Sequence, residues 1–121
     1  MKQRVVIVGA SNNPERYSYK ALISLRKHGC EVVPVHPQLA EIEGIAVVTD
    51  LSLISGSVDT VTMYVGAAIS AGLSEKLTAL KPRRVIFNPG AENAELAEIL
   101  EKSGIVCEEA CTLVLLNTGQ F

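Results

Sequence analysis

The feature that most constrains the fold is a regular alternation of short apolar runs with longer amphipathic segments along the chain. This alternation is typical of βαβ units, in which helices connect parallel strands and cover both faces of a sheet. The runs Arg4–Val8 and Glu31–Val35 are almost continuously apolar, as expected of strands that are buried on both faces. The pattern therefore predicts an α/β fold: a Rossmann-like, doubly wound three-layer sandwich with a five-stranded, mostly parallel sheet.

Three further strands are predicted at residues 60–65, 85–87 and 105–107. The first helix is expected to be capped by Ser18 and stopped by Gly29, and two more helices are expected around residues 69–80 and 95–102. Residues 44–48 suggest a short extended piece, and residues 51–54 a single helical turn. The apolar segment at residues 112–116 has two interpretations: it packs on the sheet or a neighbouring helix, or it forms a homodimer contact.

The 121 residues match the commonest size of one domain, so residues 1–121 are predicted to form a single domain. A formal charge of −2 provides no basic field for nucleic acid or for a membrane surface. The first apolar run is too short for a signal peptide, and no stretch approaches the roughly 20 residues that cross a bilayer. The odd number of cysteines gives no disulfide framework. We expect a cytoplasmic protein with reduced thiols.

A small-residue loop between the first strand and the first helix is the candidate anion site. It consists of Gly9, Ala10, Ser11, Asn12 and Asn13. Gly9 allows a tight turn, and small side chains let backbone amides approach an anion at the helix N-terminus. Arg16 and Lys20 are close enough in sequence to add full positive charges. In a doubly wound sheet, ligands bind beyond the carboxyl ends of the strands. We therefore predict a phosphate site with free, outward-pointing amides; the alternative is a plain tight turn.

The residues that the candidate site lacks also restrict its ligand. The loop does not contain the G-x-G-x-x-G fingerprint of dinucleotide-binding folds. The end of the second strand reads Val35-His36-Pro37-Gln38, without the acidic residue that holds the ribose diol of NAD. A carboxylate there would repel a phosphorylated ribose, whereas His36 and Gln38 can donate hydrogen bonds to one. The predicted ligand is an ADP-like molecule with a phosphate on its ribose, and NAD is disfavoured.

Over its whole length the chain resembles the small CoA-binding domain family, which is related to the CoA-binding domain of the α subunit of succinyl-CoA synthetase. The resemblance is carried by the loop after the first strand, the start of the next helix, the end of the second strand and the loop after the fourth, at residues 6–11, 13–16, 18–19, 33–37 and 87–90. In one departure, Gln38 stands where the family often has lysine.

The resemblance implies that CoA or an acyl-CoA is held along the strand ends. The loop at Gly9 and the side chain of Arg16 would meet the pyrophosphate, His36 and its neighbours the 3′-phosphorylated adenosine, and the loops after strands three and four the pantetheine arm. The residues expected to contact the cofactor are Gly9, Ala10, Ser11, Asn12, Asn13, Arg16, Tyr17, Ser18, Lys20, His36, Pro37, Gln38, Val65, Gly66, Asn88, Pro89 and Gly90.

The leading functional hypothesis is a non-catalytic CoA-binding protein, such as a carrier, sensor or regulatory subunit. One alternative is an NADP-type reductase or a CoA-handling enzyme completed by a partner chain; another is an interaction module that has lost its ligand. Cys107 and Cys111 lack C-x-x-C spacing and companion metal ligands. They are interpreted as small core residues, although either could lie near the thiol of CoA and form a mixed disulfide.

Overall fold

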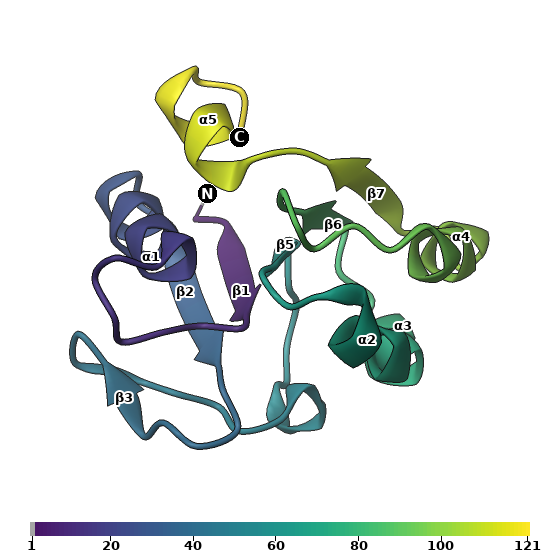
Figure 1. Cartoon of the computed structure of the whole chain (residues 1–121), viewed down its shortest axis with the longest axis horizontal. Coiled ribbons are helices and arrows are strands. Elements are labelled where there is room, and N and C mark those ends of the chain that lie inside the picture. The colour runs from purple at the N-terminus through teal and green to yellow at the C-terminus, as the bar shows by residue number, and fades with distance from the viewer. Residues whose placement is uncertain (1) are drawn as a thin grey trace.

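A computed structural model describes residues 2–121 and contains a five-stranded parallel sheet (Figure 1). The strands follow the spatial order β2-β1-β5-β6-β7, and all four neighbouring pairs are parallel. Their bounds are β1 Arg4–Val8, β2 Glu31–Val35, β5 Thr60–Met63, β6 Arg84–Phe87 and β7 Val106–Glu109. The predicted α/β fold is confirmed, with a sheet that is parallel at every pairing.

Helices cover both faces of the sheet, which confirms the three layers. Figure 1 shows α1 and α5 on one side and α3 and α4 on the other. The helical segments are α1 Tyr17–Lys27, η1 Leu51–Leu53, α2 Ala67–Ser70, η2 Ala71–Leu73, α3 Ser74–Leu80, α4 Ala94–Lys102 and α5 Thr112–Asn117. Two short strands, β3 Glu41–Ile42 and β4 Ile45–Ala46, form an antiparallel hairpin beside β2.

Alternate residues of β1 belong to two separate core clusters. Val5 and Ile7 pack with Leu22 and Leu25 of α1. Val6 belongs instead to the cluster that contains residues of α3 and α4. Because full burial of such a side chain is worth roughly 1.5–3 kcal/mol, both layers fix the height and direction of β1. The loop that leaves β1 therefore starts from a rigid point.

The strand order reverses next to β1. The chain passes from β1 to its neighbour β2 and then crosses back to β5 on the other side of β1. The loops after β1 and β5 consequently leave in opposite directions, which opens a crevice at the carboxyl ends of the strands. This topological switch point is where a ligand is expected.

The start of α1 differs from the sequence expectation. Asn13 forms a turn, because its Oδ1 accepts a hydrogen bond from the amide of Glu15 and its carbonyl accepts one from the amide of Arg16. The helix then begins at Tyr17, with Arg16 at the N-cap position. The prediction that Ser18 caps this helix is wrong: Ser18 lies in the first turn and is buried.

Several strand boundaries also shift: β6 begins one residue earlier than predicted, and β7 ends two residues later. β5 ends at Met63, two residues earlier than predicted. β7 begins at Val106, because the amide of Ile105 donates to the Leu100 carbonyl and so belongs to the end of α4. These shifts move the loops next to the three strands, but they leave the order of the elements unchanged.

The apolar segment 112–116 forms most of α5, and Leu116 packs into the same cluster as the buried face of α1. Packing against a neighbouring helix is therefore confirmed, while Val114 remains exposed to solvent. The homodimer contact stays a prediction. Within residues 2–121, no helix combines the length and the apolar character needed to cross a membrane.

Candidate ligand-binding groove

Three adjoining depressions run along the carboxyl edge of the sheet. We name them the β2-side, central and β7-side depressions, with cavity volumes of about 510, 460 and 240 Å³. Gly9 lines both the β2-side and the central depression, whereas Tyr17 and Pro89 line both the central and the β7-side depression. Tyr64 lines all three. The depressions together form one groove across the switch point.

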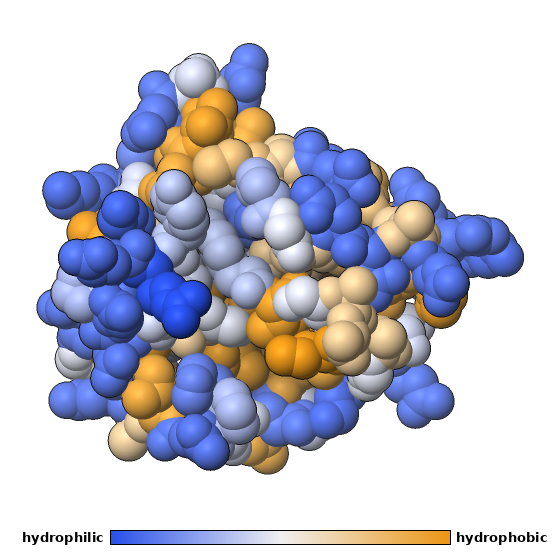
Figure 2. Space-filling view, in the orientation of Figure 1, coloured by the Kyte–Doolittle hydropathy of each residue, from blue (hydrophilic) through white to orange (hydrophobic). Residues whose placement is uncertain are grey.

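The β2-side depression is the most spacious part of the groove and is largely apolar. Its walls come from the ends of β1, β2 and β5 and from η1, α2 and η2, and comprise Val8, Gly9, Val35, His36, Pro37, Thr49, Asp50, Leu51, Tyr64, Val65, Gly66, Ile69 and Leu73. Figure 2 shows apolar atoms gathered near the middle of the molecule, beside the position of α2 in Figure 1. Ile69 is 63% exposed, and an apolar side chain on the wall of a hollow favours an apolar ligand group there.

The loop after β1 is the candidate anion site from the sequence analysis, but two of its backbone amides are already engaged. The amides of Gly9 and Ala10 both donate to the Val35 carbonyl, at 3.3 and 3.1 Å. The expectation that these amides are free is therefore wrong. The reason is the positive φ of Gly9, +86°, which turns the chain across the end of β2. A side chain at Gly9 would also collide with Val65, since a Cβ there would lie 2.8 Å from Cγ1 of Val65.

Other amides around the central depression remain available. Within residues 2–121, no acceptor is found for the amides of Ser11 and Asn12, whereas the amide of Asn13 donates to Oγ of Ser11. Among residues 2–121 the amides in the first turn of α1 likewise find no backbone acceptor, because the first bond of the helix runs from Lys20 to the Arg16 carbonyl. The amides that an anion could use therefore lie further along the chain than Gly9, at Ser11, Asn12 and the start of α1.

Arg16 supplies the positive charge of the central depression. Its side chain forms no ion pair within the described part of the chain, although the neighbouring Glu15 also lines this depression. Lys20 was predicted to join it, but the Lys20 ammonium lies over the ring of Tyr17, 5.4 Å from its centre, and borders a separate depression on α1. The guanidinium of Arg16 and the N-terminus of α1 are therefore the positive features beside the central depression.

His36 is held in one orientation at the end of β2. Its Nδ1 accepts hydrogen bonds from the amides of Gln38 and Leu39, at 3.0 and 3.1 Å. The ring proton is consequently on Nε2, which can donate one hydrogen bond to a ligand. Pro37 lines the β2-side depression, but Gln38 is exposed and lies outside it.

Asp50 is a wall residue that the sequence reasoning missed. It caps η1: its Oδ1 accepts from the amide and the hydroxyl of Ser52, and its Oδ2 pairs with Nζ of Lys76 at 2.6 Å. Lys76 and Ser52 together hold the pKa of this carboxyl well below its usual range. The pairing with Lys76 compensates the negative charge next to the groove. An acid immediately before a short helical turn was the available sequence signal.

Tyr64, the residue common to all three depressions, was also missed. It follows β5 directly and continues the hydrogen bonding between β5 and β1, since its amide donates to the Val8 carbonyl at 2.9 Å. Burial raises the pKa of its phenol to about 12, so the hydroxyl remains neutral. Tyr64 therefore offers the groove an aromatic surface.

Asn88 was predicted to contact the cofactor, but its side chain is used within the protein. Its Nδ2 donates to Oγ1 of Thr62 and to the Met63 carbonyl, and its Oδ1 accepts from the amide of Thr112. The side chain therefore joins β5, β6 and the start of α5. Of its neighbours, Pro89 lines the groove, while the Gly90 amide donates to the Glu92 carboxylate.

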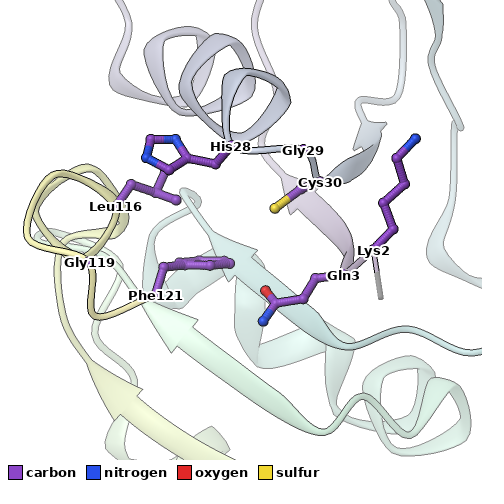
Figure 3. A pocket seen from close by; sticks show the side chains of 8 residues that line it. All are labelled: Lys2, Gln3, His28, Gly29, Cys30, Leu116, Gly119 and Phe121. Carbon is purple, nitrogen blue, oxygen red and sulfur yellow. The ribbon is translucent and has the colours of Figure 1, made fainter.

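Another depression lies at the opposite, amino end of the sheet. Figure 3 shows Gln3, Cys30 and Phe121 directed towards a common space of about 290 Å³. None of the residues predicted to bind the cofactor lines it. The predicted residues that the structure brings into one groove are Gly9, Ser11, Arg16, Tyr17, Ser18, His36, Pro37, Val65, Gly66, Asn88 and Pro89.

Comparison with known proteins agrees with this architecture. A family model described as a CoA binding domain matches residues 3–117. A crystal structure of an uncharacterized protein superimposes with a TM-score of 0.94 at 40% identity, covering 100% of this chain and 99% of the other. The uncharacterized protein YneT of Bacillus subtilis (strain 168) is 26% identical over 102 residues, which are 84% of this chain and 76% of YneT.

A larger protein contains the same fold. The dinucleotide-forming acetyl-coenzyme A synthetase 1 of Ca. Korarchaeum cryptofilum, in complex with phosphate and ADP, superimposes with a TM-score of 0.76 at 19% identity. The match covers 89% of this chain and 25% of the synthetase. At this level of identity the likeness extends to the fold alone.

Proposed function

Because the chain belongs to the CoA binding domain family, we propose that it is a non-catalytic protein that holds CoA or an acyl-CoA in the groove at the carboxyl edge of its sheet. The observation that carries the proposal is the order of surfaces along this groove. An apolar depression beside His36 and Ile69 is followed by the central depression with Arg16 and by a smaller, largely apolar depression beside Tyr64. CoA has the same order: adenosine, diphosphate and pantetheine.

The diphosphate is assigned to the central depression. The amide of Ser11, the first turn of α1 and the guanidinium of Arg16 all offer hydrogen-bond donors beside this depression. The amide of Asn12, next along the loop, has no acceptor within residues 2–121. Oriented amides at a helix N-terminus bind phosphate groups without further charges, and a cation adds to their attraction.

The adenosine is assigned to the β2-side depression. Its apolar walls suit the purine, and Nε2 of His36 can donate to a ribose phosphate. The carboxylate of Asp50 would repel that phosphate, but Lys76 neutralises it at 2.6 Å. We therefore expect CoA to bind more tightly than dephospho-CoA, by the contribution of the hydrogen bond from His36.

Isothermal titration calorimetry with CoA, dephospho-CoA, NADP, NAD and ADP, at one fixed salt concentration, tests the proposal. CoA should bind most tightly, and its affinity should fall as salt is raised, because its phosphates are held by exposed charges. A preference for NAD would overturn the ligand assignment. No binding of any of the five would favour an interaction module that has lost its ligand.

A further inference from the structure

The β7-side depression contains a thiol to which the proposed function gives no role. Cys111 lies immediately before α5 and lines this depression together with Tyr17, Tyr64, Pro89 and Leu113. Three of these residues, Tyr17, Tyr64 and Pro89, also line the central depression. A ligand whose diphosphate occupies the central depression can therefore reach the thiol of Cys111 without leaving the groove.

The other two cysteines lie elsewhere. Cys107 packs against the core cluster under α4, and burial raises the pKa of its thiol to about 11. Cys30 lines the depression at the amino end of the sheet (Figure 3), where burial and the charge of Asp59 raise its pKa. All three thiols are free, but within residues 2–121 only Cys111 faces the groove.

The proposed orientation of CoA brings a second sulfur to the same place. With adenosine in the β2-side depression and the diphosphate in the central one, the pantetheine arm extends into the β7-side depression. The terminal atom of that arm is a thiol sulfur. Two sulfur atoms in a shared cavity of about 240 Å³ have a high effective concentration relative to each other.

Building on the proposed function, we propose that Cys111 reacts with the disulfide form of CoA and becomes linked to one CoA by a mixed disulfide. The Cys111 thiolate attacks one sulfur of CoA disulfide, so a bond forms between Sγ and that sulfur while the sulfur–sulfur bond of CoA disulfide breaks. The second CoA leaves as a thiolate and takes up the proton that Cys111 released. One disulfide replaces another, and CoA disulfide is the only oxidant required. The linked CoA then occupies the groove and excludes free CoA.

The test is to incubate the protein with CoA disulfide and to follow the adduct by intact mass spectrometry and peptide mapping. The expected product carries one CoA on Cys111 and loses it on treatment with dithiothreitol. Its rate of formation should saturate with CoA disulfide concentration, because binding in the groove precedes exchange. Oxidised glutathione, which lacks the nucleotide, should react without saturation.

Matched serine variants locate the reaction. Cys111→Ser should lose the adduct, whereas Cys107→Ser and Cys30→Ser, which lie outside the groove, should keep it. Thermal melting of each variant checks that it is folded. An adduct that maps to Cys107 or Cys30 in the wild type would overturn the inference.

Calorimetry with reduced CoA separates this inference from the proposed function. If CoA binds to both the wild type and Cys111→Ser but no adduct forms on Cys111, the exchange is disproved and the CoA-binding function stands. If CoA binds to neither protein, the proposed function fails, and any adduct without saturation is non-specific labelling that overturns the inference as well.

Discussion

At the scale of single residues, Gly9 fixes the path of the chain between β1 and the groove. Its φ of +86° is a conformation that costs other residues roughly 1–2 kcal/mol, and a Cβ would lie 2.8 Å from Val65. The glycine therefore permits both the turn across β2 and the close approach of the loop after β5. Gly9 therefore acts on the fold of the loop rather than as a hydrogen-bond donor to a ligand, because its amide already donates to the Val35 carbonyl.

Gly9→Ala should lower the free energy of unfolding by about 2–4 kcal/mol, since backbone strain and the collision with Val65 add together. Gly29→Ala is the matched control: Gly29 has a similar φ of +83°, but a Cβ there meets nothing within 4 Å. It should lose only about 1–2 kcal/mol, the cost of the backbone conformation alone. Urea denaturation measures both, and equal losses would show that the contact with Val65 is unimportant.

Arg16→Ala should weaken CoA binding by roughly three- to tenfold, because the side chain is an exposed cation whose attraction to the diphosphate is partly screened. The affinity of the variant should also depend less steeply on salt. Lys27→Ala, at the other end of α1 and outside the groove, is the control and should bind as the wild type does. Unchanged affinity in Arg16→Ala would remove this residue from the site.

At the scale of elements, short polar networks hold the loops that form the groove. Asn88 joins β5, β6 and α5 through three hydrogen bonds, and Thr62 and Thr112 share a fourth at 2.8 Å. On the other side, Asp50 and Lys76 join η1 to α3. The two networks hold the elements on opposite sides of the groove in place through contacts within the protein.

Asn88→Ala should destabilise the protein by about 2–4 kcal/mol, because it leaves the buried amide of Thr112 without its acceptor and opens a small cavity. Thermal and urea denaturation measure the loss. Asn12→Ala, an exposed residue without a recorded side-chain bond in residues 2–121, should change stability by less than about 0.5 kcal/mol. A similar small effect at Asn88 would contradict the role assigned to the network.

The ion pair between Asp50 and Lys76 should make stability depend on pH at the acid end. Because the pKa of Asp50 is lowered in the folded state, its pairing stabilises the protein above the ordinary pKa of the carboxyl. That contribution is lost as the pH falls through the lower, folded-state pKa. Asp50→Asn should therefore be less stable than the wild type at neutral pH, and the gap should narrow below about pH 4. A gap that is constant with pH would exclude the ion pair as its cause.

The sequence predicted elements better than it predicted contacts between them. Arg4–Val8 and Glu31–Val35 were bounded correctly, because continuous apolar runs next to Gly9 and Pro37 leave one interpretation. The engagement of the Gly9 amide by Val35 was not predictable, since it depends on which strand lies beside β1. Asp50 was missed because it is far from the loop in sequence and reaches the groove only through the strand order. Tyr64 was missed because it was assigned to the interior of a strand over residues 60–65, whereas β5 ends at Met63.

At the scale of the whole molecule, the parallel sheet separates two edges of different character. The carboxyl edge carries the groove, formed by the loops after β1, β2, β5, β6 and β7. The amino edge carries the depression at Gln3, Cys30 and Phe121. Since every strand runs in the same direction, a ligand at one edge contacts loops from most of the chain and leaves the loops of the other edge untouched.

Hydrogen–deuterium exchange with and without CoA should reveal this separation. Saturating CoA should slow exchange at residues 9–18, 36–38, 64–66 and 88–90, because bound phosphates and the ordered loops protect their amides. Residues 28–30 and 116–121 at the amino edge should exchange as they do in the free protein, apart from the global stabilisation that slows every amide opened by full unfolding. Protection confined to the amino edge would place CoA in the depression at Gln3, Cys30 and Phe121 instead of the groove. Since Gly9 and Ala10 already donate to Val35, we expect the largest change at Ser11 and Asn12, whose amides have no acceptor within residues 2–121 before the ligand binds.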